Sequence, residues 1–387
     1  MKSAAEQLPI LERGIVDLHS RKELEKKLSK GEPLRIKLGV DPTAPDLHLG
    51  HAVVLQKLRQ FQDLGHQIVL IIGDFTAQIG DPSGRNATRP PLTHEEVLAN
   101  AETFKEQAFL VIERDKTEVV HNGDWFGKMN FTDVVGLVSK VTMQQMLQRE
   151  DFRKRMDDGT EVRLHEILYP VMQGWDSVEV RADVEIGGSD QLFNILVGRD
   201  FQKGEGIEPQ IVMTLPLLEG TDGTRKMSKS YGNYVGLTEE PSEIFGKIMS
   251  IPDELMPRYF ELVLGMDPPA DDNPRDAKVA LGKGVVALYH DEAAGEAAAE
   301  SFFKRTSGDS SAELPLLDAA GETDPIAVTA LALQLVGTPR SNGDIRRLIQ
   351  QGAIQIDGEK IASPKEPISA ESGKVLRLGK KHSVRFR

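Results

Sequence analysis

The first half of the chain alternates strand-like and helix-like stretches, and this alternation constrains the fold more than any other feature. Apolar residues run through Arg35–Val40 and again through Ile68–Gly73, and between them His51–Leu64 places its apolar side chains on one helical face. A strand, a helix and a second strand within about forty residues predict a βαβ unit with a right-handed crossover. Further stretches that predict strands occupy residues 118–120, 184–186 and 211–215. We therefore expect an α/β fold with a doubly wound parallel sheet, whose sites lie at the carboxyl ends of its strands.

The rest of the chain has a different pattern. Residues after Gly236 are helical in pattern up to residue 305, and small, polar and breaker residues then fill 306–325, which is typical of a linker. Residues 330–387 hold 11 Lys and Arg against 5 Asp and Glu, a net charge of +6 in a chain whose total is −13. Such a basic end indicates a module with an anionic partner, although a solvated charged surface explains it equally well. We expect four parts: 1–236, 237–305, 306–325 and 326–387.

Composition excludes several classes of protein. The chain has no Cys, which rules out a disulfide scaffold, thiolate catalysis and a cysteine-ligated zinc site. Its N-terminal stretch is charged throughout and does not resemble a signal peptide. No apolar run approaches the roughly 18 residues that a membrane span needs. We expect a soluble, cytoplasmic protein with no membrane partner.

The segment Asp41–His51 lies between the first predicted strand and the following helix. A strand-to-helix turn directs free backbone N–H groups and the positive end of the helix dipole toward a ligand, which suits phosphate. His48 and His51 share one helical face, and Gly50 lets a flat ring approach the backbone closely. Alone, this segment is more often a helix cap with incidental histidines, and it could equally be half of a metal site.

A second segment, Lys226–Ser230, follows a run of Gly and small polar residues. Such residues make a mobile loop, and its two lysines can meet a polyphosphate whose charge grows during a reaction. A loop of this kind is by itself more often solvated surface. Its pairing with Asp41–His51, in this order on an α/β sheet, favours a phosphate site instead.

Three other segments carry polar side chains at informative places. Tyr169, Gln173 and Asp176 are spaced four and three apart, so that on a helix they share one face and can line a pocket. Ile79–Gly84 has the composition of a tight turn. In Gly187–Gln191 a turn at a strand end explains the glycines but not the Asp-Gln pair.

These motifs together resemble a known family. His48–His51 and Lys226–Ser230 resemble the paired signatures of the class I aminoacyl-tRNA synthetases, whose catalytic domain is Rossmann-type. Nearly the whole chain resembles the bacterial tyrosyl-tRNA synthetases. The segments that carry this resemblance are Gly39–His51, Ile79–Gly84, Tyr169–Asp176, Gly187–Gln191 and Lys226–Ser230. Residues 341–352 resemble a small RNA-binding module shared with a ribosomal small-subunit protein.

The resemblance implies a tyrosine–tRNA ligase and assigns roles to residues. The catalytic residues that it implies are Thr43, His48, His51, Lys226, Lys229, Arg85 and Arg89. For ATP it implies Gly39, Asp41, His48, Gly50, His51, Gly188, Asp190, Leu217, Leu218, Lys226 and Lys229. For tyrosine it implies Asp81, Tyr169, Gln173, Asp176 and Gln191, with Asp176 accepting a hydrogen bond from the phenol. For tRNA(Tyr) it implies Arg346, Arg347, Lys380 and Lys381.

The resemblance also implies partners and leaves alternatives. It implies Mg²⁺ bound mainly through the phosphate oxygens of ATP, with no metal held by protein ligands alone, and a homodimer with the apolar stretch Phe131–Leu147 as its interface. One position departs from the family, because Lys37 stands where a substrate-binding Tyr is often found. The alternatives are another nucleotidyl-transfer enzyme, such as an adenylate-forming ligase or a cytidylyltransferase, an RNA-binding protein with a decayed synthetase body, and a tryptophanyl enzyme, in which Asp176 would fit an indole badly.

Overall fold

The structure, a computed structural model, describes residues 1–82, 93–269, 273–307, 314–319, 321–361, 363–379 and 382–387. The chain forms two compact units. The first consists of residues 1–240 and 247–281, and the second of residues 241–246 and 282–387. No helix in the described ranges has both the length and the apolar character needed to cross a bilayer.

The first unit is built on a mixed sheet. Among the described residues six strands pair in the order β1-β6-β5-β2-β3-β4. Their bounds are Asp17–His19 (β1), Arg35–Val40 (β2), Gln67–Ile72 (β3), Thr117–His121 (β4), Val184–Gly188 (β5) and Ile211–Leu215 (β6). β1 runs antiparallel to β6, and the other neighbours are parallel. The doubly wound parallel sheet is confirmed, but β1 was not predicted, because its three residues contain no apolar run.

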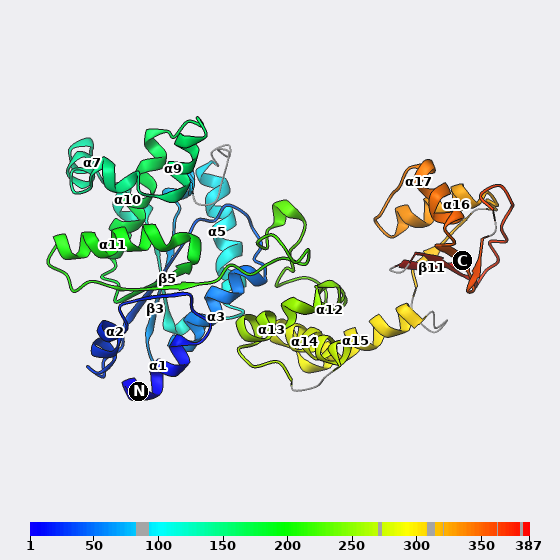
Figure 1. Cartoon of the computed structure of the whole chain (residues 1–387), viewed down its shortest axis with the longest axis horizontal. Coiled ribbons are helices and arrows are strands. Elements are labelled where there is room, and N and C mark those ends of the chain that lie inside the picture. The colour runs from blue at the N-terminus through cyan, green and yellow to red at the C-terminus, as the bar shows by residue number, and fades with distance from the viewer. Residues whose placement is uncertain (83–92, 270–272, 308–313, 320, 362, 380–381) are drawn as a thin grey trace. The chain divides into compact units, whose positions relative to one another are not determined.

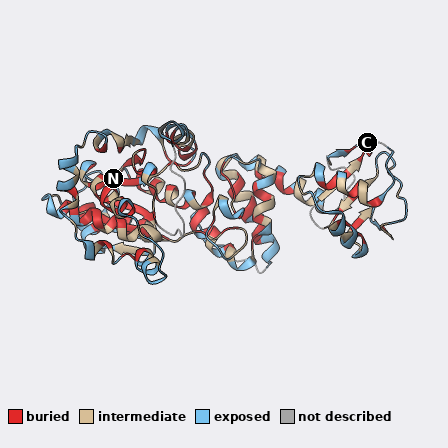
Figure 2. Ribbon diagram, turned by 90° about the horizontal axis from the view of Figure 1, so that it is seen from above, coloured by how far each residue is buried: buried red, intermediate tan, exposed pale blue. Residues whose placement is uncertain are grey.

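Helices cover both faces of this sheet. In Figure 1 α10 and α11 lie on one side of the strands, and α1 and α3 lie on the other. The helices of this unit include α1 (Ala4–Glu12), α2 (Arg21–Leu28), α3 (Leu49–Asp63), α4 (Thr76–Ile79), α5 (His94–Ala108), α6 (Gly123–Phe126), α7 (Phe131–Val138), α8 (Met143–Met146), α9 (Glu150–Asp157), α10 (Leu164–Glu179), α11 (Leu192–Gly204) and α13 (Met256–Tyr259). Buried residues follow the strands and the helix faces toward them (Figure 2).

Glycines let α10 and α11 pack closely. A Cβ on Gly174 would lie 2.8 Å from Cγ1 of Val197, and a Cβ on Gly198 would lie 2.7 Å from Oγ of Ser177. Both are shorter than ordinary van der Waals contact, so the two backbones could not approach this closely with larger residues. The close approach fixes α10, and with it the three polar side chains that the sequence places on one helical face.

The strand order creates a switch point. The chain leaves β2 toward β3 and β4 on one side, whereas β5 and β6 lie on the other side of β2. The carboxyl ends of β2 and β5 therefore adjoin where the winding reverses, which is where ligands bind in open α/β sheets. Asp41 follows β2 directly, and Asp190 lies in the 3₁₀ turn Ser189–Gln191 after β5.

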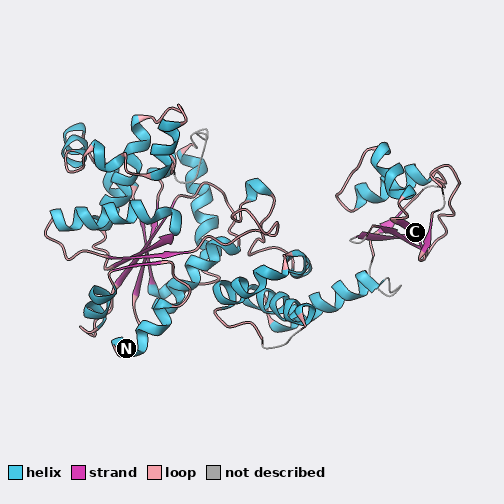
Figure 3. Ribbon diagram, in the orientation of Figure 1, coloured by secondary structure: helices cyan, strands magenta, loops and turns pink. Residues whose placement is uncertain are grey.

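The second unit contains a small sheet with its own core. α12 (Pro241–Ser250) and α14 (Pro274–Tyr289) contribute to both units, and α15 (Glu292–Ser307), α16 (Pro325–Leu335) and α17 (Asn342–Gln350) belong to the second. Within the described residues its strands pair in the order β7-β11-β10-β8-β9. Their bounds are Leu316–Leu317 (β7), Ile354–Ile356 (β8), Glu359–Lys360 (β9), Val375–Leu378 (β10) and His382–Phe386 (β11). Figure 3 distinguishes these strands from the helices.

This small sheet and its helices form an α+β domain. Val328, Ile345, Leu376 and Val384 are 0% exposed and belong to one core cluster. Leu316–Leu317 lies inside the stretch that the sequence places in a linker, yet it pairs in parallel with β11. The breaker residues around it are typical of a linker, but pairing with a distant strand decides its structure. The other domain boundaries stay predictions.

Candidate active site at the carboxyl ends of β2 and β5

Asp41, the residue after β2, is hydrogen-bonded to side chains of both α10 and α4. Its Oδ2 accepts a hydrogen bond from the Tyr169 hydroxyl at 2.9 Å, and its Oδ1 accepts one from Oγ1 of Thr76 at 2.7 Å. A Cβ on Gly73 would lie 2.2 Å from Oδ1 of Asp41, so only glycine fits there. Burial, together with the carboxylates of Asp41 and Asp81, raises the pKa of Tyr169 well above its usual value. Asp41, expected with the ATP residues, thus lies against a residue expected to bind tyrosine.

Asp176 lies farther along α10 and is 4% exposed. Its Oδ1 accepts a hydrogen bond from Nε1 of Trp125 at 3.0 Å, and Asn122 donates to its Oδ2 at 3.4 Å. Burial raises the pKa of Asp176 to about 7, and the positive charge of Lys37 opposes that rise. Asn122 and Trp125 belong to no motif of the sequence, although both follow β4, and ligand-binding residues are expected at the carboxyl ends of such strands.

A chain of amides links the remaining side chains expected for tyrosine. Nδ2 of Asn194 donates to Oε1 of Gln173 at 2.9 Å and to Oε1 of Gln191 at 3.0 Å. Nε2 of Gln191 donates to Oδ2 of Asp81 at 2.8 Å, and Arg149 lies 3.5 Å from the same carboxylate. The structure therefore connects Asp81, Gln173 and Gln191. Asn194 and Arg149, which join them, had no motif that could have identified them.

The histidines of the first signature stack at the start of α3. Their ring centroids are 4.0 Å apart, and the backbone N–H of His48 donates to Nδ1 of His51 at 3.2 Å. Burial, reinforced by nearby positive charge, lowers the pKa of His48 to about 2 and that of His51 to about 4. Both rings are therefore neutral near pH 7. A Cβ on Gly50 would lie 3.0 Å from the His48 ring, which explains the glycine between them.

The second signature meets the first. The backbone N–H of Leu49 donates to the carbonyl of Val235 at 3.0 Å, which joins α3 to the end of the loop. Nζ of Lys229 lies 2.6 Å from Oδ2 of Asp46, and Nζ of Lys226 lies 3.5 Å from Oδ2 of Asp190. Two ammonium groups thus reach the carboxyl ends of two adjacent strands, where a polyphosphate would meet both.

The other residues expected for ATP fall into two groups. A Cβ on Gly188 would lie 2.9 Å from Cδ2 of Leu217 and 2.8 Å from Oδ1 of Asp190, so these three gather after β5 and β6. The carbonyl of the buried Leu218 accepts the N–H of Met227, which ties it to the loop.

Thr43 and Gly39 belong to the other group, near the end of β2. Thr43 is half-buried and donates its N–H to the carbonyl of Asp41. Gly39 is exposed within β2, before that carboxylate.

Some expected residues cannot be placed here. Arg85, Arg89, Lys380 and Lys381 lie outside the described residues. Arg346 and Arg347 are exposed on α17 of the second unit, where Arg347 forms an ion pair with Asp344 at 2.6 Å. No group of three or more His, Asp or Glu within the described ranges is placed to hold a metal ion.

The chain is similar to known proteins over most of its length. The family model of the class I tRNA synthetases (W and Y) matches residues 29–307. A tyrosine–tRNA ligase of Francisella tularensis is 48% identical over 98% of this chain and 98% of the relative. One of Thermotoga maritima is 47% identical over 98% and 97%.

Solved structures share the fold. A truncated mitochondrial tyrosyl-tRNA synthetase of Aspergillus nidulans has a TM-score of 0.64 and 23% identity, covering 79% of this chain and 94% of that one. A tyrosyl-tRNA synthetase of Archaeoglobus fulgidus complexed with L-tyrosine has a TM-score of 0.61 and 22% identity, covering 76% and 99%.

Proposed function

This chain belongs to the class I tRNA synthetases of the tryptophan and tyrosine group, and we propose that it is a tyrosine–tRNA ligase. It activates L-tyrosine with ATP to tyrosyl-adenylate and pyrophosphate, and then transfers tyrosine to the 3′-terminal adenosine of tRNA(Tyr). The observation that carries the choice of amino acid is the buried Asp176 carboxylate, held by Trp125 and Asn122. A phenol can donate to this carboxylate, whereas phenylalanine would leave it buried without that partner.

In the first step the tyrosine carboxylate forms a bond to the α-phosphorus of ATP, and the bond to pyrophosphate breaks. The carboxylate is already a nucleophile, so the protein supplies position and charge stabilisation rather than a base. The loop cations Lys226 and Lys229 exchange their carboxylate partners for phosphate oxygens. The neutral rings of His48 and His51 act as hydrogen-bond donors, with Thr43 beside them and with Arg85 and Arg89 as further cations.

The amino acid and the nucleotide occupy neighbouring strand ends. Asp81 and Gln191, with Tyr169 and Gln173 on α10, hold the ammonium group of tyrosine. The carboxylate of Asp190, next to Gly188, accepts hydrogen bonds from the ribose hydroxyls of ATP. The remaining residues assigned to the nucleotide are Gly39, Asp41, Gly50, Leu217 and Leu218. Mg²⁺ enters with ATP and is held mainly by phosphate oxygens and water, the coordination that this ion prefers with nucleotides.

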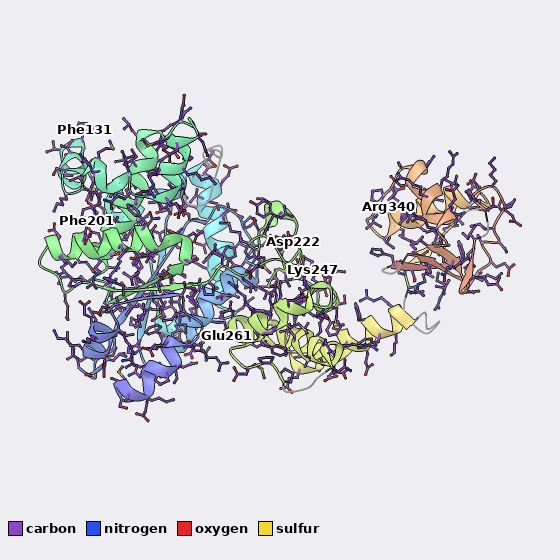
Figure 4. All side chains as sticks on the ribbon, in the orientation of Figure 1. Phe131, Phe201, Asp222, Lys247, Glu261 and Arg340 are labelled. Atoms are coloured by element: carbon purple, nitrogen blue, oxygen red, sulfur yellow. The ribbon has the colours of Figure 1, made fainter. Side chains whose placement is uncertain are left out.

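Two further partners follow from surface features. The small α+β domain binds tRNA, with Arg346 and Arg347 contacting phosphates. The reaction takes place in the cytoplasm. Phe131 is 82% exposed, Val135 48% and Met143 49%, and all three come from α7 and α8. Figure 4 shows Phe131 at the edge of the first unit. Because exposed apolar side chains of this size mark interaction surfaces, a second copy of the chain covers them in a homodimer.

Exchange of labelled pyrophosphate into ATP, measured with each of the twenty amino acids, tests the proposal. We expect exchange with tyrosine and background rates with phenylalanine, tryptophan and histidine. Comparable exchange with phenylalanine would contradict the role of Asp176. Exchange with tryptophan alone would show that the chain is a tryptophan enzyme of the same family. A preparation that exchanges with no amino acid would overturn the proposed function altogether.

A further inference from the structure

We propose that the buried ion pair of Lys37 and Glu185 sets the affinity for tyrosine without touching the substrate. The pair fixes the position of the Gln173 side chain and controls the charge of the Asp176 carboxylate. This inference rests on the proposed function. Its starting point is the position of Lys37, which stands where the family often has a substrate-binding Tyr. The structure gives this residue a different task.

The pair joins the two strands between which the winding of the sheet reverses. Lys37 and Glu185 face each other in register on β2 and β5. Nζ of Lys37 lies 2.9 Å from Oε1 of Glu185, and the side chains are 0% and 1% exposed. Replacing a buried ion pair by apolar residues of similar volume is often neutral or stabilising. Stability alone therefore does not account for charges at this place.

Every hydrogen of the Lys37 ammonium already has a partner. Besides Glu185, it donates to the backbone carbonyl of Gln173 at 2.9 Å and to Oγ of Ser177 at 2.7 Å. An ammonium has three donors and no acceptor. Lys37 therefore has no hydrogen left for a phenol oxygen and cannot replace the absent Tyr directly. Its effect on the substrate must pass through its neighbours on α10.

Glu185 contacts the same two residues of α10, Gln173 and Ser177. Its Oε1 accepts from Nε2 of Gln173 at 3.3 Å, and its Oε2 accepts from Ser177 at 2.8 Å and from Gln210 at 2.6 Å. Gln173 is thus fixed at its backbone carbonyl and at its amide nitrogen. Its remaining amide oxygen points to Asn194 and so to the residues assigned to the ammonium group of tyrosine.

The pair also sets the electrostatic field at Asp176. The charged groups that act on this carboxylate are Lys37 from β2, which lowers its pKa, and Glu185 from β5, which raises it. On α10 itself the titratable neighbour is Tyr169, beside the carboxylates of Asp41 and Asp81.

The segment after β4 contributes only neutral donors to Asp176, from Asn122 and Trp125. Nδ1 of His121, the last residue of β4, lies 3.3 Å from Oδ2 of Asp74, which follows β3. Removing one member of the Lys37–Glu185 pair should therefore shift the protonation of Asp176 in a direction set by the sign of the charge removed.

Tyrosine affinity measured by equilibrium titration across pH, with kcat and KM from exchange, tests this. In the wild-type protein we expect the affinity to rise as pH increases through about 7, because the ionised carboxylate is the better acceptor. With Lys37→Met we expect that midpoint to move up by about one pH unit, and with Glu185→Gln to move down, since a nearby charge shifts a carboxyl pKa by about 1–3 units. Both variants raise KM for tyrosine about tenfold, the effect of one lost charged hydrogen bond, and change kcat little.

A matched control separates position from stability. Lys27 is also buried and pairs at 2.8 Å with Asp183, which directly precedes the amino end of β5. Lys27→Met should lower the melting temperature but leave the pH midpoint and KM for tyrosine as in the wild type. Shifts of the same sign in Lys37→Met and Glu185→Gln, or no shift, would overturn the proposal.

A double variant covers the case in which a single variant does not fold. Lys37→Met with Glu185→Gln removes both charges, so we expect a midpoint near that of the wild type together with a raised KM. A double variant that binds tyrosine with wild-type KM would overturn the proposal. Wild-type protein without tyrosine-dependent exchange would instead count against the proposed function, so the two failures are distinguishable.

Discussion

Asp176 in the first unit and Arg346 in the second represent two ways of using charge. Asp176 is 4% exposed and accepts hydrogen bonds from two named donors, whereas Arg346 lies on the exposed face of α17 next to another arginine. A buried charge must have its partners, so each member of its network matters individually. Exposed cations are screened by salt and act additively. The first region therefore suits discrimination between small molecules, and the second suits a long anionic partner.

The largest expected effect separates the two regions completely. Removing residues 314–387 should leave tyrosine-dependent pyrophosphate exchange intact and reduce tRNA charging about a thousandfold, because phosphate contacts supply much of the affinity for nucleic acids. The cut precedes β7 because that strand pairs with β11 and would be left alone by a later cut. Both activities are measured on the same preparation. Loss of exchange in a folded truncated protein would show that the regions do not work separately.

The next effect lies within the first unit, at the phosphate end. Lys229→Ala and His48→Ala should each slow adenylate formation about a hundredfold, because each removes a donor that acts mainly in the transition state. Tyrosine affinity should barely change, and rapid-quench and equilibrium measurements distinguish the two quantities.

Lys247→Ala is the matched control for Lys229. Both lysines lie near the ring of Tyr234, with Nζ of Lys247 at 4.6 Å from the ring centroid and Nζ of Lys229 at 5.8 Å, but Lys247 forms an ion pair with Glu239. The Lys247→Ala variant should form the adenylate at the wild-type rate. If Lys229→Ala chiefly weakens tyrosine binding, its assignment to the phosphates is wrong.

Asp176→Ala tests the buried network itself. We expect a loss of tyrosine affinity of about ten- to a hundredfold, the range for one hydrogen bond to a charged group. Burial of this carboxylate raises its pKa and is unfavourable near neutral pH, whereas its removal leaves Trp125 and Asn122 without this acceptor, so the melting temperature should change little. Asp157→Ala, at an exposed position of α9, is the control. A variant with an unchanged preference for tyrosine over phenylalanine and intact folding would exclude Asp176 as the phenol partner.

The smallest effect should come from the exposed arginines. Changing Arg346 and Arg347 together to Ala should weaken tRNA binding only several-fold, while reducing the slope of log affinity against log salt by about 1–2. Lys22 and Lys26, exposed on α2, provide a matched pair of alanine substitutions that should not change the slope. An identical slope in the Arg346 and Arg347 variant would leave these residues without their proposed role.

Much of the candidate site could be predicted from the sequence because its residues lie in short segments at strand ends. Asp41–His51 and Gly187–Gln191 follow β2 and β5, and strand, turn and helix are encoded locally by apolar periodicity and glycine. Residues such as Trp125 and Asn194 could not be predicted in this way. They join the site through contacts with residues far away in the chain, and no spacing within their own segments records those contacts.

The alternation of strands and helices, the basic end of the chain and the order of the motifs can all be read from the sequence, because each depends on neighbouring residues. The strand order, and with it which charges meet, depends on contacts between distant residues. Lys37 looks like an unexplained departure until β2 is placed next to β5, where it faces Glu185. The linker-like Leu316–Leu317 becomes a strand only because β11 lies beside it. In both cases the free energy comes from a partner far away in sequence, and local pattern contains no information about such partners.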